Sequence, residues 1–167
     1  MYRKKGSLDS EPELILDPNK LAKGHKFFSI GSVSISPNQR YVAYTVDYSG
    51  DEYYALFFKD MATGKTTSTS IQGVSNFSWY ADNYHFLVIT QNERWQGNRC
   101  LRGSLGNSST TLLYLEEDSE YELSLYESSD ESRIFLLSYN KSRTECYDVP
   151  ANNPDSEMQL ITSRDQD

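Results

Sequence analysis

The same hairpin pattern occurs three times along this chain. Each time a short β-type run ends in turn residues and returns as an apolar strand, and these returning strands begin at Val42, Phe86 and Ile134. The starts lie 44 and 48 residues apart, and a repeat of about 40 to 50 residues is the length of one four-stranded propeller blade. The repeat therefore predicts an all-β fold: a partial β-propeller of about three four-stranded antiparallel blades.

Each repeat has room for four strands separated by turn residues, such as Pro37-Asn38 and Thr63-Gly64. The predicted strands are 32–36, 41–46, 53–59 and 66–71 in the first repeat, 75–79, 85–90, 99–105 and 110–115 in the second, and 121–126, 134–138, 144–149 and 158–162 in the third. We divide the chain, 1–167, accordingly into blades at 32–72, 73–116 and 117–164, preceded by residues 1–31.

Residues 1–31 contain the one short N-terminal helix that the sequence predicts. Asp17 is a suitable N-cap, Pro18 fits the first helical position, and Gly24 suits the exit. Either the short basic opening at 1–7 or the run at 11–16, with its apolar residues 14–16, could form a strand at the edge of a sheet. We therefore expect a leading edge strand followed by the helix.

The returning strands are apolar on both faces, as strands between stacked sheets should be. Strands of an ordinary sandwich would alternate more cleanly, so we favour blades over a sandwich. Closed propellers contain about four to eight blades. Three blades leave open faces, which predicts that the chain is part of a longer polypeptide and that it self-associates when studied alone.

The charge balance argues against two classes of partner. The chain has 24 acidic and 16 basic side chains and a net charge of −8, whereas nucleic acids and anionic membranes are bound by basic faces. The cluster Arg3-Lys4-Lys5 is too short to change this expectation. The sequence has no membrane-length apolar stretch and no N-terminal signal core, which favours the cytoplasm. Cys100 and Cys146, without close spacing, fit reduced intracellular thiols.

The spacing of the nine glycines excludes three motifs. No two glycines are two, four or five positions apart, as a dinucleotide loop, a nucleophile elbow or a phosphate loop requires. His25 and His85 have no second histidine or Cys-x-x-Cys nearby, so no local zinc site can form. We assign no catalytic, cofactor-binding or metal-ligating residue and no cofactor. A dispersed Ser–His–Asp triad is the least favoured alternative.

Acidic residues gather between the second and third repeats. Glu116, Glu117 and Asp118, followed by Glu120 and Glu122, could help to attract basic peptides. A solvated turn is the simpler interpretation.

The aromatic and histidine candidates have plain structural interpretations. Trp79 lies in the hairpin pattern where a core residue belongs, whereas Trp95 belongs to a loop and its role stays open. His25 lies at the exit of the helix and His85 at the start of a strand. We assign neither histidine a catalytic role.

Four stretches of the chain carry a family resemblance. They read G-S-L-D-S-E-P-E-L-I-L-D-P-N-K-L-A-K-G-H-K-F-F at 6–28, S-P-N-Q-R-Y-V-A-Y-T-V-D-Y-S-G-D-E at 36–52, F-K-D-M-A-T-G-K at 58–65 and L-Y-L-E-E-D-S-E-Y-E-L-S at 113–124. Together they resemble the N-terminal propeller portion of oligopeptidase B (protease II), a branch of the prolyl oligopeptidase family of serine peptidases. Two departures touch loops more than the hydrophobic pattern: Asn38-Gln39 stands where Asp-Gly is usual, and Gly103 stands where a histidine is common before the run Ser104-Leu105-Gly106.

The resemblance implies a seven-bladed propeller joined to an α/β-hydrolase domain that holds Ser, Asp and His and cleaves short peptides after Lys or Arg. This chain resembles roughly the first three blades of a propeller that caps the active site and excludes large folded substrates. No position matches a family catalytic residue, so none is carried over. The implied partners are the hydrolase domain of the same full-length protein and, in the intact enzyme, short basic peptides.

Two functions therefore remain open. The first is a gating and substrate-filtering segment of a serine peptidase, inactive by itself. The second is an independent protein- or peptide-binding module that uses exposed β-edges or the acidic run.

Overall fold

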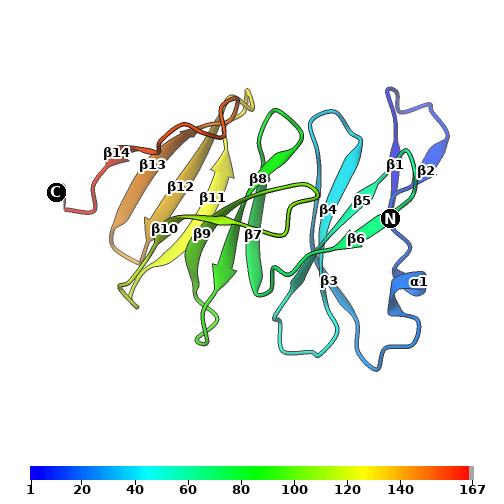
Figure 1. The fold of residues 1–167 in the computed structure, drawn as a ribbon, viewed down its shortest axis with the longest axis horizontal. Coiled ribbons are helices and arrows are strands. Elements are labelled where there is room, and N and C mark those ends of the chain that lie inside the picture. Colours follow the sequence, from blue (N-terminus) through cyan, green and yellow to red (C-terminus); the bar gives the residue numbers. More distant parts are fainter. Residues whose placement is uncertain (166–167) are drawn as a thin grey trace.

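Three four-stranded antiparallel sheets follow one another along the chain in the computed structural model, which describes residues 1–165 (Figure 1). The first sheet is β3 (Ser29–Ile35), β4 (Tyr41–Asp47), β5 (Ala55–Asp60) and β6 (Thr66–Ser68); the second is β7 (Val74–Trp79), β8 (His85–Gln91), β9 (Gly97–Ser104) and β10 (Thr111–Leu115); the third is β11 (Glu122–Glu127), β12 (Arg133–Tyr139), β13 (Thr144–Pro150) and β14 (Gln159–Thr162). In each sheet, strands adjacent in sequence are paired neighbours.

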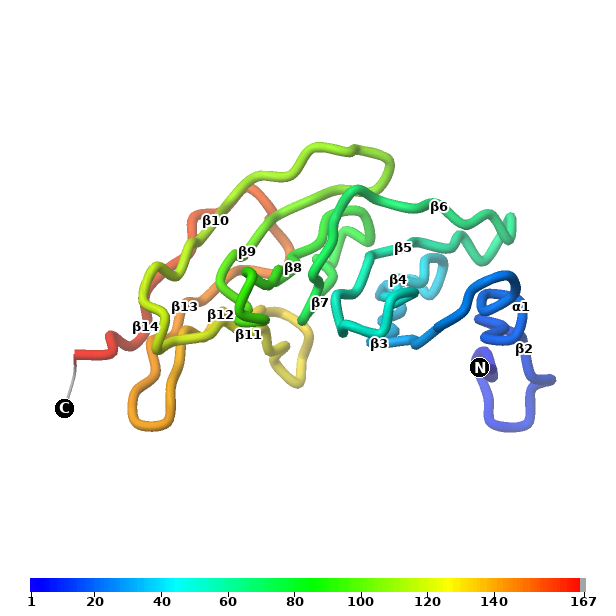
Figure 2. The backbone as a smooth tube through the Cα atoms, turned by 90° about the horizontal axis from the view of Figure 1, so that it is seen from below, coloured from blue at the N-terminus to red at the C-terminus, as the bar shows by residue number. Residues whose placement is uncertain are grey.

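The sheets are arranged as a fan. Figure 2 shows β3, β7 and β11 along the inner side of the arc and β6, β10 and β14 along its outer side. This arrangement confirms the predicted partial propeller with three blades and a short N-terminal helix. The sandwich alternative is wrong, because residues 1–165 form three successive four-stranded meanders stacked one after another, and not two sheets closed into one sandwich.

The N-terminal segment contains more strand than we predicted. β1 (Tyr2–Lys4) pairs with β2 (Pro12–Leu14), so a two-stranded sheet replaces the single leading strand. Helix α1 (Pro18–Ala22) follows, and the Asp17 carboxylate caps it by accepting the backbone N–H of Asn19 at 3.1 Å and of Lys20 at 3.3 Å. No helix within residues 1–165 is long and apolar enough to cross a bilayer.

The same type of turn joins the first two strands of each of the three sheets. Gln39, Asn83 and Glu131 each adopt a left-handed backbone conformation, with φ between 58° and 65°. The residue before each of them is an asparagine or aspartate. Its side-chain oxygen accepts the backbone N–H of the residue two positions after it, and these acceptors are Asn38, Asp82 and Asp130. The repeated turn is therefore a shared local geometry built from different residues.

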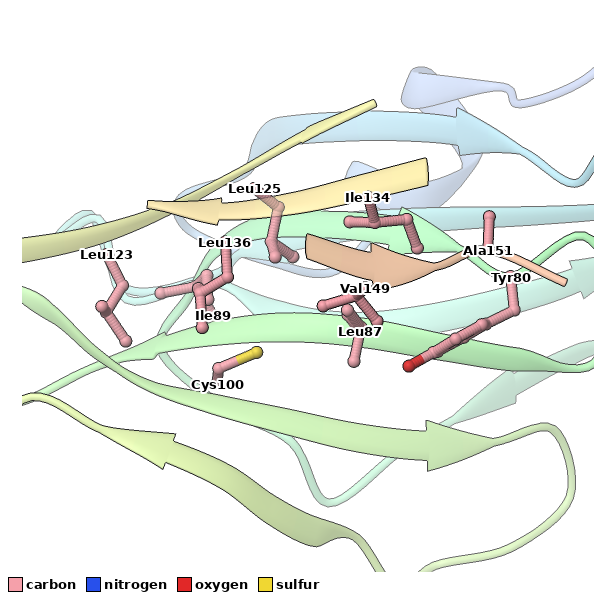
Figure 3. Close-up of a cluster of buried hydrophobic side chains, with 10 residues drawn as sticks. All are labelled: Tyr80, Leu87, Ile89, Cys100, Leu123, Leu125, Ile134, Leu136, Val149 and Ala151. Carbon is pink, nitrogen blue, oxygen red and sulfur yellow. The ribbon is translucent and has the colours of Figure 1, made fainter. Parts of the chain in front are cut away.

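Three apolar clusters join the successive parts of the fan. Ile15 and Leu16 pack with β4 residues, Leu56 and Phe58 pack with Trp79 and Phe86, and a third cluster fills the space between the second and third sheets. Figure 3 shows this third cluster with side chains entering from both sheets. Burial of each large apolar side chain contributes about 1.5–3 kcal/mol, so the sheets stabilise one another mainly through these contacts.

The three returning strands differ in how completely they are covered. Every residue of 42–47 and of 86–90 is buried, because β4 and β8 each have a neighbour on both faces. β12 alternates instead: Ile134 and Leu136 are buried against the second sheet, whereas Phe135 and Leu137 are half-buried on the opposite side. That opposite side of the third sheet is the open face of the fan.

Gly103 lies within β9 and not in a loop, against the ring of Phe86. A Cβ at this position would lie 2.4 Å from the ring carbon Cζ of Phe86. The histidine that is common in the family resemblance would therefore require Phe86 to move.

Candidate functional site

The acidic run forms one side of a polar hollow at the boundary between the second and third sheets. The hollow has a volume of about 360 Å³ and lies between residues 115–121 and the β8–β9 turn. Its position on the linker between β10 and β11 follows directly from the chain order of the two blades. This hollow is the candidate site for basic ligands.

Glu116 is an exception to the predicted solvated turn. Its side chain is only 5% exposed and lies 2.7 Å from Nη2 of Arg164. Ser138 Oγ also donates a hydrogen bond to the Glu116 carboxylate. Burial opposes ionisation of Glu116, but the hydrogen bonds from Arg164 and Ser138 outweigh it and hold the pKa below its ordinary value.

Arg164 joins several groups in this buried network. Its guanidinium reaches Glu145 at 3.3 Å and Tyr114 Oη at 3.1 Å, and it lies 4.1 Å from the ring centroid of Tyr121. Hydrogen bonds to Glu116 raise the Arg164 pKa far above its ordinary value, so the group is permanently charged. Glu116 is therefore committed to an internal ion pair and is not available to a ligand.

The remaining members of the acidic run are exposed, as predicted: Glu117, Asp118, Glu120 and Glu122. Bonds from side chain to backbone hold this segment in place, since the Glu116 carboxylate accepts the backbone N–H of Asp118 at 3.0 Å and the Asp118 carboxylate accepts the backbone N–H of Glu120 at 2.9 Å. The linker thus presents fixed negative charges that can attract cationic peptides.

Two side-chain hydrogen bonds join the inner strands of the second and third sheets. Asn76 Nδ2 donates to Ser124 Oγ at 3.1 Å, and Ser78 Oγ donates to Glu127 at 2.6 Å. These bonds join β7 to β11. They fix the spacing of β7 and β11 on the concave side of the fan (Figure 2).

The two histidines do not line the polar hollow. His25 is exposed and stacks on Tyr48 with ring centroids 3.9 Å apart. His85 Nδ1 lies 2.6 Å from the Asp82 carboxylate, which also accepts the His85 backbone N–H. Asp82 therefore organises the turn before β8. Within residues 1–165, no group of three or more His, Cys, Asp or Glu side chains is placed to hold a metal ion.

The tryptophans and cysteines occupy contrasting environments. Trp79 is 5% exposed, which confirms its predicted place in the core, whereas Trp95 is 58% exposed in the β8–β9 turn. The Trp95 indole donates to the backbone oxygen of Asp51 at 2.9 Å and so joins the second sheet to the first. Both cysteines are free, and burial raises the pKa of Cys100 to about 12, which makes its thiol a poor nucleophile.

The family assignment comes from the whole chain. Residues 1–167 match the family described as prolyl oligopeptidase, N-terminal β-propeller domain. The chain belongs to this family. It is 25% identical over 161 residues to protease 2 of Moraxella lacunata, and 27% identical over 164 residues to an uncharacterized peptidase of Sinorhizobium fredii.

Solved structures of prolyl oligopeptidase relatives have the same fold. Oligopeptidase B from Leishmania major matches 98% of this chain with a TM-score of 0.84 at 22% identity, and oligopeptidase B from Trypanosoma brucei matches 98% with a TM-score of 0.78 at 23% identity. The two sequence matches include 92–93% of this chain but only 22–23% of each relative. The two structural matches include 23–24% of the solved chains. It thus spans about a quarter of the length of the peptidases it resembles.

Proposed function

We propose that this chain acts as the gating and substrate-filtering segment of an oligopeptidase B-like serine peptidase that cleaves short peptides after Lys or Arg. In this function the chain supplies no catalytic residue, and the hydrolase domain of the same full-length protein performs the chemistry. Family membership and the likeness to oligopeptidase B over 98% of the chain support the proposal.

The observation that carries the preference for basic peptides is the exposed acidic linker. Glu117, Asp118 and Glu120 project from the boundary between two blades of a chain with a net charge of −8. Their attraction for a cationic peptide acts over about 10 Å at 0.1 M salt. A propeller segment with this charge concentrates basic peptides near its surface without forming a deep binding pocket.

Binding of a short basic peptide tests the proposal. The tripeptide acetyl-Lys-Arg-Lys-amide is expected to bind the chain weakly, with an affinity that falls as salt rises. The double variant Glu117→Gln, Asp118→Asn should weaken this binding severalfold. The matched control Asp9→Asn, Glu11→Gln removes two exposed carboxylates from the N-terminal hairpin and should leave it unchanged. Equal loss in both variants would mean that only net charge matters.

Activity measurements test the proposal that this chain supplies no catalytic residue. The purified chain is expected not to hydrolyse an arginine p-nitroanilide, and sequencing of the gene beyond the codon for Asp167 is expected to find a hydrolase domain with a G-x-S-x-G motif. Hydrolysis by the chain itself, free of contaminating peptidase, would refute the proposed inactivity.

An independent binding module is the second candidate function, favoured by the open face and by the outer strands. Capture of one defined protein partner, lost in the Glu117→Gln, Asp118→Asn variant, would support it over gating. Glu116 must stay unchanged in this test, because its replacement would disturb the buried pair with Arg164.

We further propose that the protein works in the cytoplasm. The free thiols of Cys100 and Cys146 support this location. Recovery of the native protein from a periplasmic or secreted fraction would contradict it.

A further inference from the structure

A cavity of about 620 Å³ lies between the first and second sheets near their outer strands. Its walls are β6 with the turn before it on one side and residues 104–108, after β9, on the other. The apolar lining includes Ile71, Phe58 and Phe86, which are at most 8% exposed. Cavities of about 300 to 1,000 Å³ with such a lining commonly hold small molecules.

Thr67 lies on the wall of the cavity that the first sheet forms. It pairs with Phe58, so its side chain shares the face turned toward the second sheet. Thr67 lines the cavity together with Phe58 and Phe86, so a larger side chain at position 67 would enter it.

The mouth of this cavity has a local positive charge. Lys65 and Asp60 both line it, but the Asp60 carboxylate is already paired with Arg40 at 3.1 Å. Among the ion pairs of residues 1–165, none neutralises the Lys65 ammonium group. A cation without a partner at the rim of an apolar cavity complements an anionic ligand, even though the whole chain has a net charge of −8.

We propose that this cavity binds a small amphipathic carboxylate. The aromatic or branched aliphatic body of this ligand lies against Phe58 and Phe86, and the carboxylate of the ligand pairs with Lys65. Hydroxyl groups along the walls, including those of Thr67 and Ser108, can donate further hydrogen bonds to the acid. The site is separate from the polar hollow beside the acidic linker, with which it shares no lining residue.

Trp79 provides a direct reporter of occupancy. Its ring lies behind the apolar lining, with centroids 5.6 Å from Phe58 and 6.4 Å from Phe86. The Trp95→Phe variant leaves Trp79 as the only tryptophan of the chain. Titration of this variant with 4-phenylbutyrate should produce a saturable change in emission and a rise in Tm, because a ligand that binds only the folded state stabilises it.

The charge of the ligand is tested with a neutral analogue. 4-Phenyl-1-butanol has the same apolar body and is expected to bind about tenfold more weakly, since it lacks a charge-assisted bond to Lys65. Lys65→Gln should remove most of this difference. Equal binding of the acid and the alcohol by the Trp95→Phe chain would overturn the assignment to carboxylates.

Variants that fill the cavity locate the binding site. Thr67→Tyr places a larger side chain on the wall of the cavity and is expected to abolish binding. Thr66→Tyr is the matched control, because Thr66 pairs with Lys59 and its side chain lies on the other face of the same strand. Ser108→Phe fills the cavity from the opposite wall and decides the result if Thr67→Tyr does not fold. Undiminished binding by a folded cavity-filling variant, or no binding of 4-phenylbutyrate at all, would refute the proposal.

Discussion

The guanidinium of Arg164 lies 2.7 Å from the carboxylate of Glu116, an ion pair between residues 48 positions apart. The pair ties the segment after β14 to the linker between β10 and β11, across the boundary of two blades. Glu145 lies on the same guanidinium at 3.3 Å. One cation therefore neutralises two carboxylates that have little access to water.

Replacement of this arginine should destabilise the chain strongly. Arg164→Met leaves Glu116 and Glu145, with side chains 5% and 11% exposed, without their shared cation. We expect the free energy of unfolding to fall by about 3 kcal/mol, as measured by urea denaturation. The control is Arg143→Met, because the Arg143–Asp165 pair is 3.8 Å long and exposed and should contribute less than about 1 kcal/mol. Equal effects in the two variants would contradict the buried network.

Asp47 should contribute to the loss of stability in acid. It is 1% exposed and accepts hydrogen bonds from Ser49, Gly50 and Glu52. Burial opposes its charge, but these bonds prevail and lower the pKa from 3.8 to about 2. Because the folded-state pKa is the lower one, the stabilisation is complete above about pH 4 and is lost as the pH falls toward 2.

The measurement compares Tm between pH 7 and pH 2 for the native chain and for Asp47→Asn. The variant should have the lower Tm at pH 7, and the difference should shrink between pH 4 and pH 2. Asp9→Asn, on the exposed N-terminal hairpin, is the control. A constant difference between Asp47→Asn and the native chain at every pH would show that the charge of Asp47 is not the cause.

Local sequence patterns were sufficient to predict the blades, because each hairpin is encoded within a short segment. The turn at 36–40 illustrates this: Asn38 accepts the N–H of Arg40 at 3.0 Å, and Ser36 accepts the N–H of Tyr41 at 2.9 Å. Turn residues and apolar strands adjacent in sequence therefore fix the fold class without knowledge of distant contacts.

Features that depend on the stacking of blades could not be predicted in this way. The burial of Glu116 depends on Arg164, and nothing near position 116 signals that partner. The strand predicted at 66–71 ends at Ser68. The Leu56 oxygen accepts the backbone N–H of Thr69 at 3.1 Å, but the Leu56 N–H donates to the oxygen of Ile71 at 3.1 Å, so the chain bulges here and the regular ladder stops. The Thr69 hydroxyl accepts the N–H of Ile71 at 3.1 Å and supports this bulge, which strand propensity alone does not reveal.

The open face of the third sheet should cause self-association. Phe135 and Leu137 are half-buried on this face. In the preceding sheet, Leu87 and Ile89 are buried because the third sheet covers them. We expect light scattering to give a mass above the 19.2 kDa of one chain as concentration rises. Leu137→Glu should restore the monomer, whereas Leu8→Glu, at a residue 85% exposed on the N-terminal hairpin, should not. A monomeric native chain at high concentration would contradict this prediction.

Gln39 should be replaceable by glycine with a gain in stability. Gln39 has φ of 61°, a left-handed conformation that costs a residue with a Cβ about 1–2 kcal/mol. Glycine adopts it freely but also has a more flexible unfolded state, so Gln39→Gly should raise the free energy of unfolding by about 0.5–1 kcal/mol. Asn83→Gly, at the matching turn position with φ of 65°, provides the contrast.

Asn83 uses its side chain in a way that Gln39 does not. Its Oδ1 accepts the N–H of Asn38 at 2.6 Å, and its Nδ2 donates to the Ala81 oxygen at 3.0 Å. Asparagine also tolerates the left-handed region well, so Asn83→Gly should give no gain or a loss. Urea denaturation of both variants checks the prediction. A gain at position 83 that equals the gain at position 39 would mean that backbone strain alone, and not the side-chain bonds between the first and second blades, governs the stability of these turns.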